Sequence, residues 1–365
     1  MLEAFWSSVG EELARTWVAR VLTPAFAFWV GGVALVWWNT HTAEIAADGW
    51  VAALAASAAA LGALPVLVQG ALVVGGLVLV AASAVVAERL TLPVLRVLEG
   101  YWTRPVWLHR MLVAYRRWRY RGVRSRTAPL QLRQHRRRRR PPPPAEDEEL
   151  VLLRKKPKRT RSTAEQDRLQ DLERRAALTA TEQTRLGRGV AWLQTTPPED
   201  GLGMPTRFGD ILRSAEHRPG TSYGIDAVVC WNALWLLLPT EARTELTAVR
   251  SALDAAVRGW LWGALFLVWT PVTPWAALVG VGVPLLSYRF GILPRAIAFG
   301  ELIVTSYDLY RMKLYDALHL PRPTSPADER TTTGPRLTAA LAGTLVEPGL
   351  SYRTDEPPPT TPAAG

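Results

Sequence analysis

The chain has 365 residues, 48% of them hydrophobic, and its 43 basic and 32 acidic side chains give a formal net charge of +11. Its single cysteine, Cys230, excludes an intramolecular disulfide and any metal site built from several cysteines. No Gly-Lys pair occurs, which excludes a Walker-type phosphate loop. Long uncharged stretches beside arginine-rich ones predict an all-α integral membrane protein with a basic cytoplasmic part.

Residues 1–20 carry apolar side chains at helical spacing, namely Leu2, Phe5, Trp6, Val9, Leu13 and Trp17. Charged side chains occupy other positions of the same stretch, so the pattern predicts an amphipathic helix. Its apolar side would lie at the inner membrane interface or pack against the rest of the protein.

A first membrane span is predicted over residues 22–38. No charged residue occurs between Arg20 and Glu44, and the apolar core ends in Trp37 and Trp38, which we interpret as interfacial anchors. A cleaved signal peptide is the alternative for this stretch.

A second span is predicted over residues 66–87, so residues 21–90 would form a membrane hairpin. The Ala-rich residues 50–64 between the spans are expected to lie at the outer interface, and a further crossing is the alternative. Arginines precede the first span and acidic residues follow it, which favours a cytoplasmic amino terminus.

Residues 91–140 are predicted to form basic, aromatic juxtamembrane helices, the first of which opens at Pro93. A similar string at Pro294 suggests two related halves. Residues 100–145 hold 14 arginines and no acid, a positive-inside signal. This run would bind anionic lipid, only fix topology, or bind nucleic acid. We expect lipid contacts from Arg116, Arg117, Arg119, Arg121, Arg136, Arg137, Arg138, Arg139 and Arg140, and interfacial anchoring from Trp102 and Trp107.

Four prolines and opposed charge blocks predict a disordered linker over residues 141–161. Residues 162–258 are expected to form a helical cytoplasmic domain, in which Thr179 and Glu182 read as a capping box. Seven of its residues are the candidate docking site for a protein partner: Arg207, Phe208, Asp210, Arg213, Glu216, Tyr223 and Asp226.

Residues 259–288 are uncharged and are interrupted by two prolines three positions apart. Such prolines suit a tight outer turn between two short spans, with Trp269 and Trp275 as interfacial anchors. A single kinked span is the alternative. With the first hairpin, this predicts four spans and cytoplasmic termini. Residues 289–320 would form a cytoplasmic amphipathic helix, and residues 321–365 a disordered Pro/Thr-rich tail that contains at most a short helix over residues 337–345.

The sequence offers few groups for chemistry. The five histidines are isolated, and none has a second histidine or a carboxylate at metal-ligand spacing. Arg213 and Glu216 lie three positions apart, as an ordinary surface ion pair would. Gln69 is the only large polar side chain inside a predicted span. We therefore predict no catalytic residue, no metal site and no cofactor.

Two strings, Pro205–Glu216 with Tyr223–Asp226 and Tyr307–Tyr315, resemble a recurring pattern in an uncharacterised family of multi-pass membrane proteins. That family occurs in bacteria with arginine-rich, high-GC proteomes. The resemblance implies an actinobacterial-type inner-membrane protein, and it implies no activity.

These features predict a non-catalytic protein of the bacterial plasma membrane, an anchor or scaffold that presents its helical cytoplasmic domain to a protein partner. Anionic inner-leaflet lipids are the second expected partner. One alternative is an oligomeric pore or membrane-perturbing effector, based on residues 50–64, Gln69 and the short second hairpin. Another is a membrane tether for nucleic acid, based on the arginine run.

Overall fold

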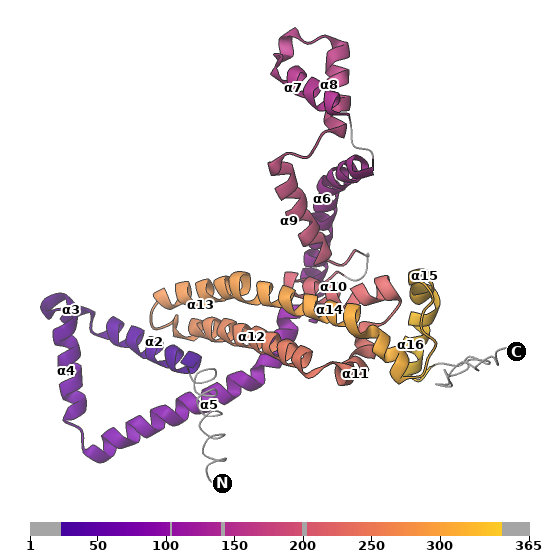
Figure 1. Ribbon diagram of the computed structural model, residues 1–365. Helices are drawn as coiled ribbons and strands as arrows, with labels where there is room; N and C mark the ends of the chain where they lie inside the picture. Colours follow the sequence, from indigo (N-terminus) through magenta and orange to yellow (C-terminus); the bar gives the residue numbers. More distant parts are fainter. Residues whose placement is uncertain (1–22, 103, 140–142, 199–202, 345–365) are drawn as a thin grey trace, which may run out of the picture. The chain divides into compact units, whose positions relative to one another are not determined.

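The computed structural model describes residues 23–102, 104–139, 143–198 and 203–344 (Figure 1). Over these ranges all regular structure is helical and no strand occurs, so the all-α prediction is confirmed. The amphipathic helix predicted for residues 1–20 lies outside the described residues.

The chain divides into two compact units. We call residues 1–102 and 219–365 the apolar unit, and residues 103–218 the basic unit. The predicted cytoplasmic domain of residues 162–258 is therefore not one body, because its last part belongs to the apolar unit. The helical pattern in the sequence continues across this boundary, which falls inside the helix α10 (Arg207–Tyr223).

The apolar unit begins with four helices, which are α2 (Thr23–Thr40), α3 (Thr42–Asp48), α4 (Trp50–Gly62) and α5 (Val66–Glu99). The sequence predicts a new helix that begins at Pro93. In the structure, Pro93 lies inside α5, so this prediction is wrong. Its missing N–H removes one helical hydrogen bond. The helix continues because Leu95 and Leu98, on the following turn, are buried.

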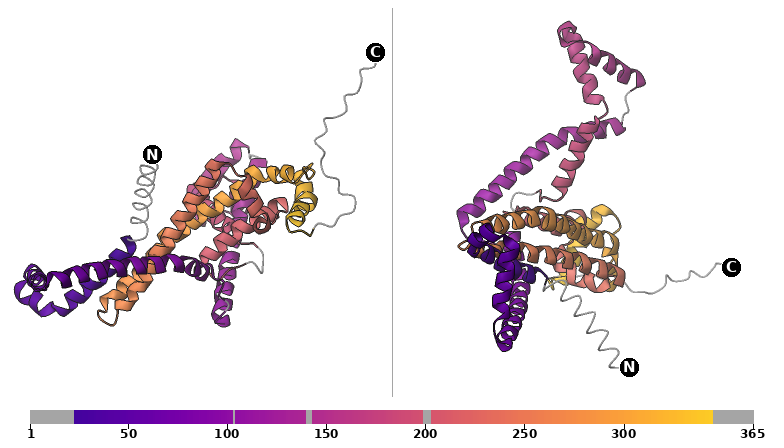
Figure 2. Two further views of the ribbon diagram at one scale, coloured as in Figure 1. Left: turned by 90° about the horizontal axis from the view of Figure 1, so that it is seen from below. Right: turned by 90° about the vertical axis from the view of Figure 1, so that its left-hand side faces the viewer.

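A second pair of helices follows later in the same unit. The first arm is α12 (Thr240–Leu265) with the 3₁₀ turn Phe266–Trp269, and the second is α13 (Trp275–Leu286). The second arm continues through the π-helical turn Ser287–Ile292 into α14 (Leu293–Ala317), and the arms run side by side (Figures 1 and 2). The predicted pair of helices is confirmed, and the single kinked helix is excluded.

Two glycines allow these arms to approach closely. A Cβ atom on Gly263 would lie 2.7 Å from Cγ1 of Val283, and one on Gly280 would lie 2.9 Å from the backbone nitrogen of Leu267. Small residues at a helix–helix contact let backbones pack tightly, which is the usual solution inside membranes.

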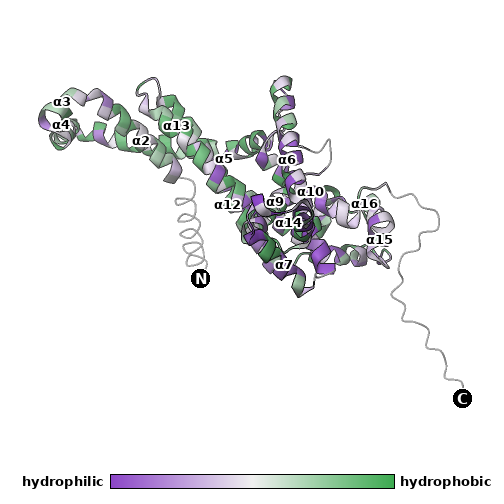
Figure 3. Ribbon diagram, turned by 90° about the horizontal axis from the view of Figure 1, so that it is seen from above, coloured by the Kyte–Doolittle hydropathy of each residue, from purple (hydrophilic) through white to green (hydrophobic). Residues whose placement is uncertain are grey.

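Three helical segments among the described residues are long and apolar enough to cross a membrane: Val66–Glu99, Thr240–Trp269 and Trp275–Ala317. Figure 3 shows that α5 and α13 are largely hydrophobic along their length. The shorter α2, 18 residues long, is apolar but is not among the three. Membrane residence is thus supported, whereas the count of four spans stays a prediction.

Aromatic side chains join α2 to the second helix pair. Phe28 contacts Trp262 and Phe266, with ring centroids 5.1 and 5.9 Å apart. Trp29 contacts Trp269 at 6.0 Å and donates a hydrogen bond from Nε1 to Oγ of Ser83 on α5, 3.1 Å away. This cluster holds the apolar helices together.

The carboxyl-terminal part of the apolar unit is folded up to Thr344, in contrast to the disorder predicted from residue 321. The short helix expected over residues 337–345 overlaps α16 (Gly334–Leu341). A short helix α15 (Pro326–Asp328) leads into the π-helical turn Glu329–Thr333 and α16 (Gly334–Leu341). The turn contacts α14, and α16 packs against α11 (Ala227–Leu237). Leu337 is fully buried, and Glu329 accepts a hydrogen bond from Nε of Arg311 at 2.8 Å. These long-range contacts outweigh the Pro/Thr-rich composition. Residues 345–365 lie outside the described residues.

The basic unit contains α6 (Val106–Arg139), α7 (Pro144–Lys155), the 3₁₀ turn Lys158–Thr160, α8 (Thr163–Arg175), α9 (Ala180–Gln194) and most of α10. The predicted linker of residues 141–161 is therefore mainly helical where it is described. Leu150 of α7 packs on Leu172 of α8, and Arg168 pairs with Glu149 at 2.9 Å, so opposed charges join two helices. The capping box of Thr179 and Glu182 is confirmed at the start of α9.

Candidate functional site

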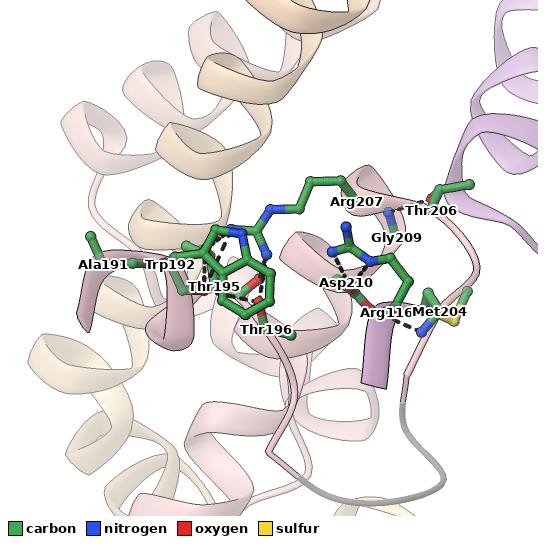
Figure 4. Close-up of polar contacts among 10 residues, drawn as sticks. All are labelled: Arg116, Ala191, Trp192, Thr195, Thr196, Met204, Thr206, Arg207, Gly209 and Asp210. Carbon is green, nitrogen blue, oxygen red and sulfur yellow. Dashed lines mark hydrogen bonds and ion pairs between the residues drawn. The ribbon is translucent and has the colours of Figure 1, made fainter. Parts of the chain in front are cut away.

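The basic unit is centred on a buried ion pair between α6 and α10. Nε of Arg116 donates to Oδ2 of Asp210 at 2.7 Å, and a second guanidinium nitrogen contacts the same oxygen (Figure 4). The backbone N–H of Met204 donates to Oδ1 at 2.9 Å. Asp210 is only 1% exposed. Burial raises the pKa of this carboxyl group, and the charge of Arg116 and the Met204 N–H oppose that effect.

Trp192 of α9 lies beside this pair and is surrounded by guanidinium groups. Cζ of Arg207 lies 4.8 Å from the ring centroid, and those of Arg119 and Arg116 lie 5.8 and 5.9 Å from it. Arg207 also donates to the carbonyl oxygen of Thr195 at 3.0 Å (Figure 4). The Trp192 ring therefore makes cation–π interactions with three guanidinium groups. It also packs against the apolar parts of these arginine side chains.

These contacts correct the predicted docking site. Phe208 is fully buried, and the side chains of Arg207 and Asp210 form hydrogen bonds inside the basic unit. The sequence shows no sign of these contacts, because the partners of Asp210 and Arg207 lie on α6 and at the end of α9. Arg213 and Glu216 fit the expected surface pair, with 3.6 Å between the charged atoms.

The last two predicted docking residues belong to the apolar unit. The hydroxyl of Tyr223 donates to Oδ1 of Asp308 at 2.7 Å, and Cζ of Arg311 lies 3.9 Å from the Tyr223 ring centroid. Asp226 caps α11 by accepting from the N–H of Val228 at 2.8 Å. Both residues therefore make contacts within the apolar unit.

The arginines predicted to contact lipid also separate into groups. Arg116 is buried and paired with Asp210, so it is removed from that set. Arg137 pairs with Asp147 at 2.9 Å, and Arg117 is partly buried. Arg140 lies outside the described residues. Five members of the set are exposed on α6: Arg119, Arg121, Arg136, Arg138 and Arg139.

The sequence did not single out Arg133, which nevertheless joins α6 to α9. Its guanidinium donates to the carbonyl oxygens of Ala176 and Ala177, both at 3.1 Å, and pairs with Glu182 at 3.2 Å. The hydrogen bond from the backbone of Thr179 lowers the pKa of Glu182, and the charge of Arg133 acts in the same direction. In the sequence, the capping box with Thr179 was the only indication that the Glu182 side chain has a fixed position.

The tryptophans predicted as interfacial anchors also differ from one another. Trp38, Trp107 and Trp275 are exposed, at 52, 68 and 70% of their surface. The indole groups of the remaining three form hydrogen bonds or aromatic contacts inside the apolar unit. Trp37 bonds Ser57 at 2.9 Å, Trp102 bonds the Val97 carbonyl at 3.1 Å, and Trp269 joins the aromatic cluster.

Gln69, the polar residue that suggested a pore, forms hydrogen bonds at the turn between α4 and α5. Its Nε2 donates to the carbonyl oxygens of Leu64 and Gly62, at 2.8 and 3.1 Å. The amide therefore satisfies backbone acceptors where α4 ends and α5 begins. This contact is local, and a channel lining is not needed to explain the residue.

A groove of about 1160 Å³ runs along α12 in the apolar unit. Its lining includes Thr247, Ser251 and other small residues of α12, together with Arg243 and Arg295. The lining residues supply hydroxyl and guanidinium donors, and none carries a carboxylate, imidazole or thiol. No group of three or more potential metal ligands occurs within the described ranges.

Comparisons with known proteins were made against family models, curated proteins and solved structures. None of them matches this chain. The family resemblance noted in the sequence thus stays a prediction.

Proposed function

We propose that this chain is a non-catalytic integral protein of the bacterial plasma membrane that acts as an anchor or scaffold. In this proposal α2 with α5, and α12 with α13, form two membrane hairpins, and both termini are cytoplasmic. The basic unit of residues 103–218 is then presented to a cytoplasmic protein partner.

The observation that carries the proposal is the internal network of the basic unit. The Arg116–Asp210 pair, the Trp192 cluster and the fork of Arg133 join α6, α9 and α10 without using any residue of the apolar helices. None of the three candidate spans lies within the described part of residues 103–218. A chain that couples apolar spans to a separately packed polar body suits a scaffold better than a purely lipid-embedded role.

The docking surface is revised accordingly. Of the predicted docking residues, Arg213 and Glu216 keep 40 and 36% of their side chains accessible. Because exposed ion pairs contribute little to stability, a partner with complementary charges can replace their mutual contact at small cost. We therefore place the partner on this part of α10.

Topology can be tested with single introduced cysteines, because Cys230 is fully buried. Val272→Cys lies in the turn between α12 and α13, and Ser125→Cys lies on exposed α6. In intact cells we expect an impermeant maleimide to label position 272, and to label position 125 only after permeabilisation. The reverse pattern, or labelling of both from outside, contradicts the proposed orientation.

Partner docking can be tested by photo-crosslinking in cells. A crosslinker placed at Arg213 should give a discrete protein adduct that is lost on Glu216→Lys, which reverses the neighbouring charge. The same crosslinker at Gln131 on exposed α6 is the matched control and should not give this adduct. If neither position gives an adduct with another protein, the scaffold proposal fails even where the topology is correct.

A further inference from the structure

Between residues 107 and 127, α6 has two opposite faces. Arg116, Tyr120 and Thr127 are buried or partly buried, and Thr127 lies against Gly189 of α9. Nine residues correspond to about two and a half helical turns, so Trp107 and Arg116 point to opposite sides. One side of α6 thus belongs to the core of the basic unit, and the other remains open.

The open side carries large apolar and aromatic residues at spacings of four, four and three. Trp107, Met111, Tyr115 and Trp118 are 68, 54, 50 and 70% exposed. Tyr115 and Trp118 also contact one another, with ring centroids 6.0 Å apart. We call these four residues the aromatic stripe. A stripe of this size in contact with water is costly, and it commonly marks an interaction surface.

Arginines border the aromatic stripe. Arg110 and Arg121 are exposed and follow one edge at helical spacing, and Arg126 is exposed beyond the other. The exposed Arg119 extends toward Trp192, with its Cζ atom 5.8 Å from the ring centroid. No acidic residue occurs in residues 100–145, so the arginines around the stripe have no acidic neighbour in the sequence. An apolar face bordered by arginine is the pattern of a helix that lies in a membrane interface.

We propose that the aromatic stripe of α6 lies on an anionic lipid surface, with Arg110 and Arg121 contacting the phosphate groups. Tryptophan and tyrosine favour the headgroup region, because their rings are apolar and their N–H and O–H groups stay hydrated. Nucleic acid would also match the charge and the rings. Lipid is favoured because the helix that contains a candidate span, Val66–Glu99, ends seven residues before Val106. An extended chain of that length reaches at most about 25 Å.

This lipid contact goes beyond the proposed partner docking and uses different residues of the basic unit. It does not depend on the partner proposal, but it does require a membrane-anchored chain. Arg213 and Glu216, the docking residues, lie on α10 and outside the stripe. The two proposals can therefore fail independently.

The test uses the full-length protein in nanodiscs, where both leaflets have the same composition. An environment-sensitive fluorophore on Met111→Cys reports the stripe, and the same probe on Gln131→Cys reports an exposed position of α6 outside it. We compare phosphatidylcholine alone with phosphatidylcholine mixed with phosphatidylglycerol. The expected result is a blue shift at position 111 with phosphatidylglycerol, quenching there by spin-labelled lipid, and no change at position 131.

Two variants separate charge from apolar contact. Arg110→Gln/Arg121→Gln should lower the ratio of lipid-bound to free α6 by roughly fivefold per arginine. Trp107→Ser/Trp118→Ser keeps the charges and should abolish the blue shift, and both variants alter only exposed side chains. An unshifted probe at position 111 on anionic lipid overturns the proposal. So does a shift that requires added single-stranded oligonucleotide, which would assign the stripe to nucleic acid.

Discussion

Arg116 and Asp210 stand 94 residues apart in the chain and form a buried ion pair, in which Nε donates to Oδ2 at 2.7 Å. The pair connects the long basic helix α6 to the start of α10. Two residues that the sequence offered as separate surface contacts, one for lipid and one for a protein partner, are thus used to hold the basic unit together.

The pair should be costly to break from one side. Asp210→Ala leaves the buried guanidinium of Arg116 without its counter-charge, and we expect a loss of about 3–5 kcal/mol in the stability of the basic unit. Pulse proteolysis of the full-length protein in detergent measures this loss. Arg213→Ala, which breaks an exposed pair, is the control and should cost less than about 1 kcal/mol. Equal losses in the two variants would show that the buried pair has no special role.

The close contact of the second helix pair predicts a sharp difference between two glycines of α13. A Cβ atom on Gly280 would lie 2.9 Å from the backbone nitrogen of Leu267, whereas one on Gly282 would meet nothing within 4 Å. Gly280→Ala should therefore destabilise the detergent-solubilised protein by about 1–3 kcal/mol, and Gly282→Ala should be close to neutral. Thermal unfolding followed by tryptophan fluorescence compares them, and similar melting of the two variants argues against this packing.

The folded carboxyl-terminal segment can be tested at Gly334. A Cβ atom there would lie 2.7 Å from the carbonyl oxygen of Glu329 and even closer to that of Tyr223. Since backbone atoms have no room to yield, Gly334→Ala should displace residues 326–341 and expose them to protease. Gly76→Ala is the matched control, because a Cβ atom there meets nothing within 4 Å. Protection of this segment in both variants would restore the disordered tail that composition predicts.

The single thiol provides a test of pH dependence. Burial raises the pKa of Cys230 to about 11, so we expect very slow alkylation at neutral pH in the folded protein and rapid alkylation after denaturation. Between about pH 9 and 11 the folded chain retains this proton while the unfolded chain releases it. Stability should therefore fall as pH rises through this window, and Cys230→Ala should reduce the slope. Fast labelling of the native protein near pH 7 would contradict the burial of the thiol.

Features fixed by neighbouring residues were predictable from the sequence. The capping box of Thr179 and Glu182 involves atoms three residues apart, and the prolines at 271 and 274 impose a turn by their own geometry. Pro93 was misread because a local signal competes with packing further along the helix, where Leu95 and Leu98 are buried. The same competition explains the helix of residues 144–155, which is stabilised by α8 through Leu150 and Leu172.

The sequence by itself determined the all-α class, the apolar segments suited to a membrane and the concentration of arginine after α5, because these depend only on composition and on periodicity along the chain. Tertiary structure decided which arginines are internal. It placed Arg116, Arg133 and Arg207 in contacts with Asp210, Glu182 and Trp192, and it left the aromatic stripe of α6 exposed. The physical reason is that the burial of a side chain depends on which distant segment packs over it. Buried and exposed arginines are therefore indistinguishable in the sequence until their partners are known.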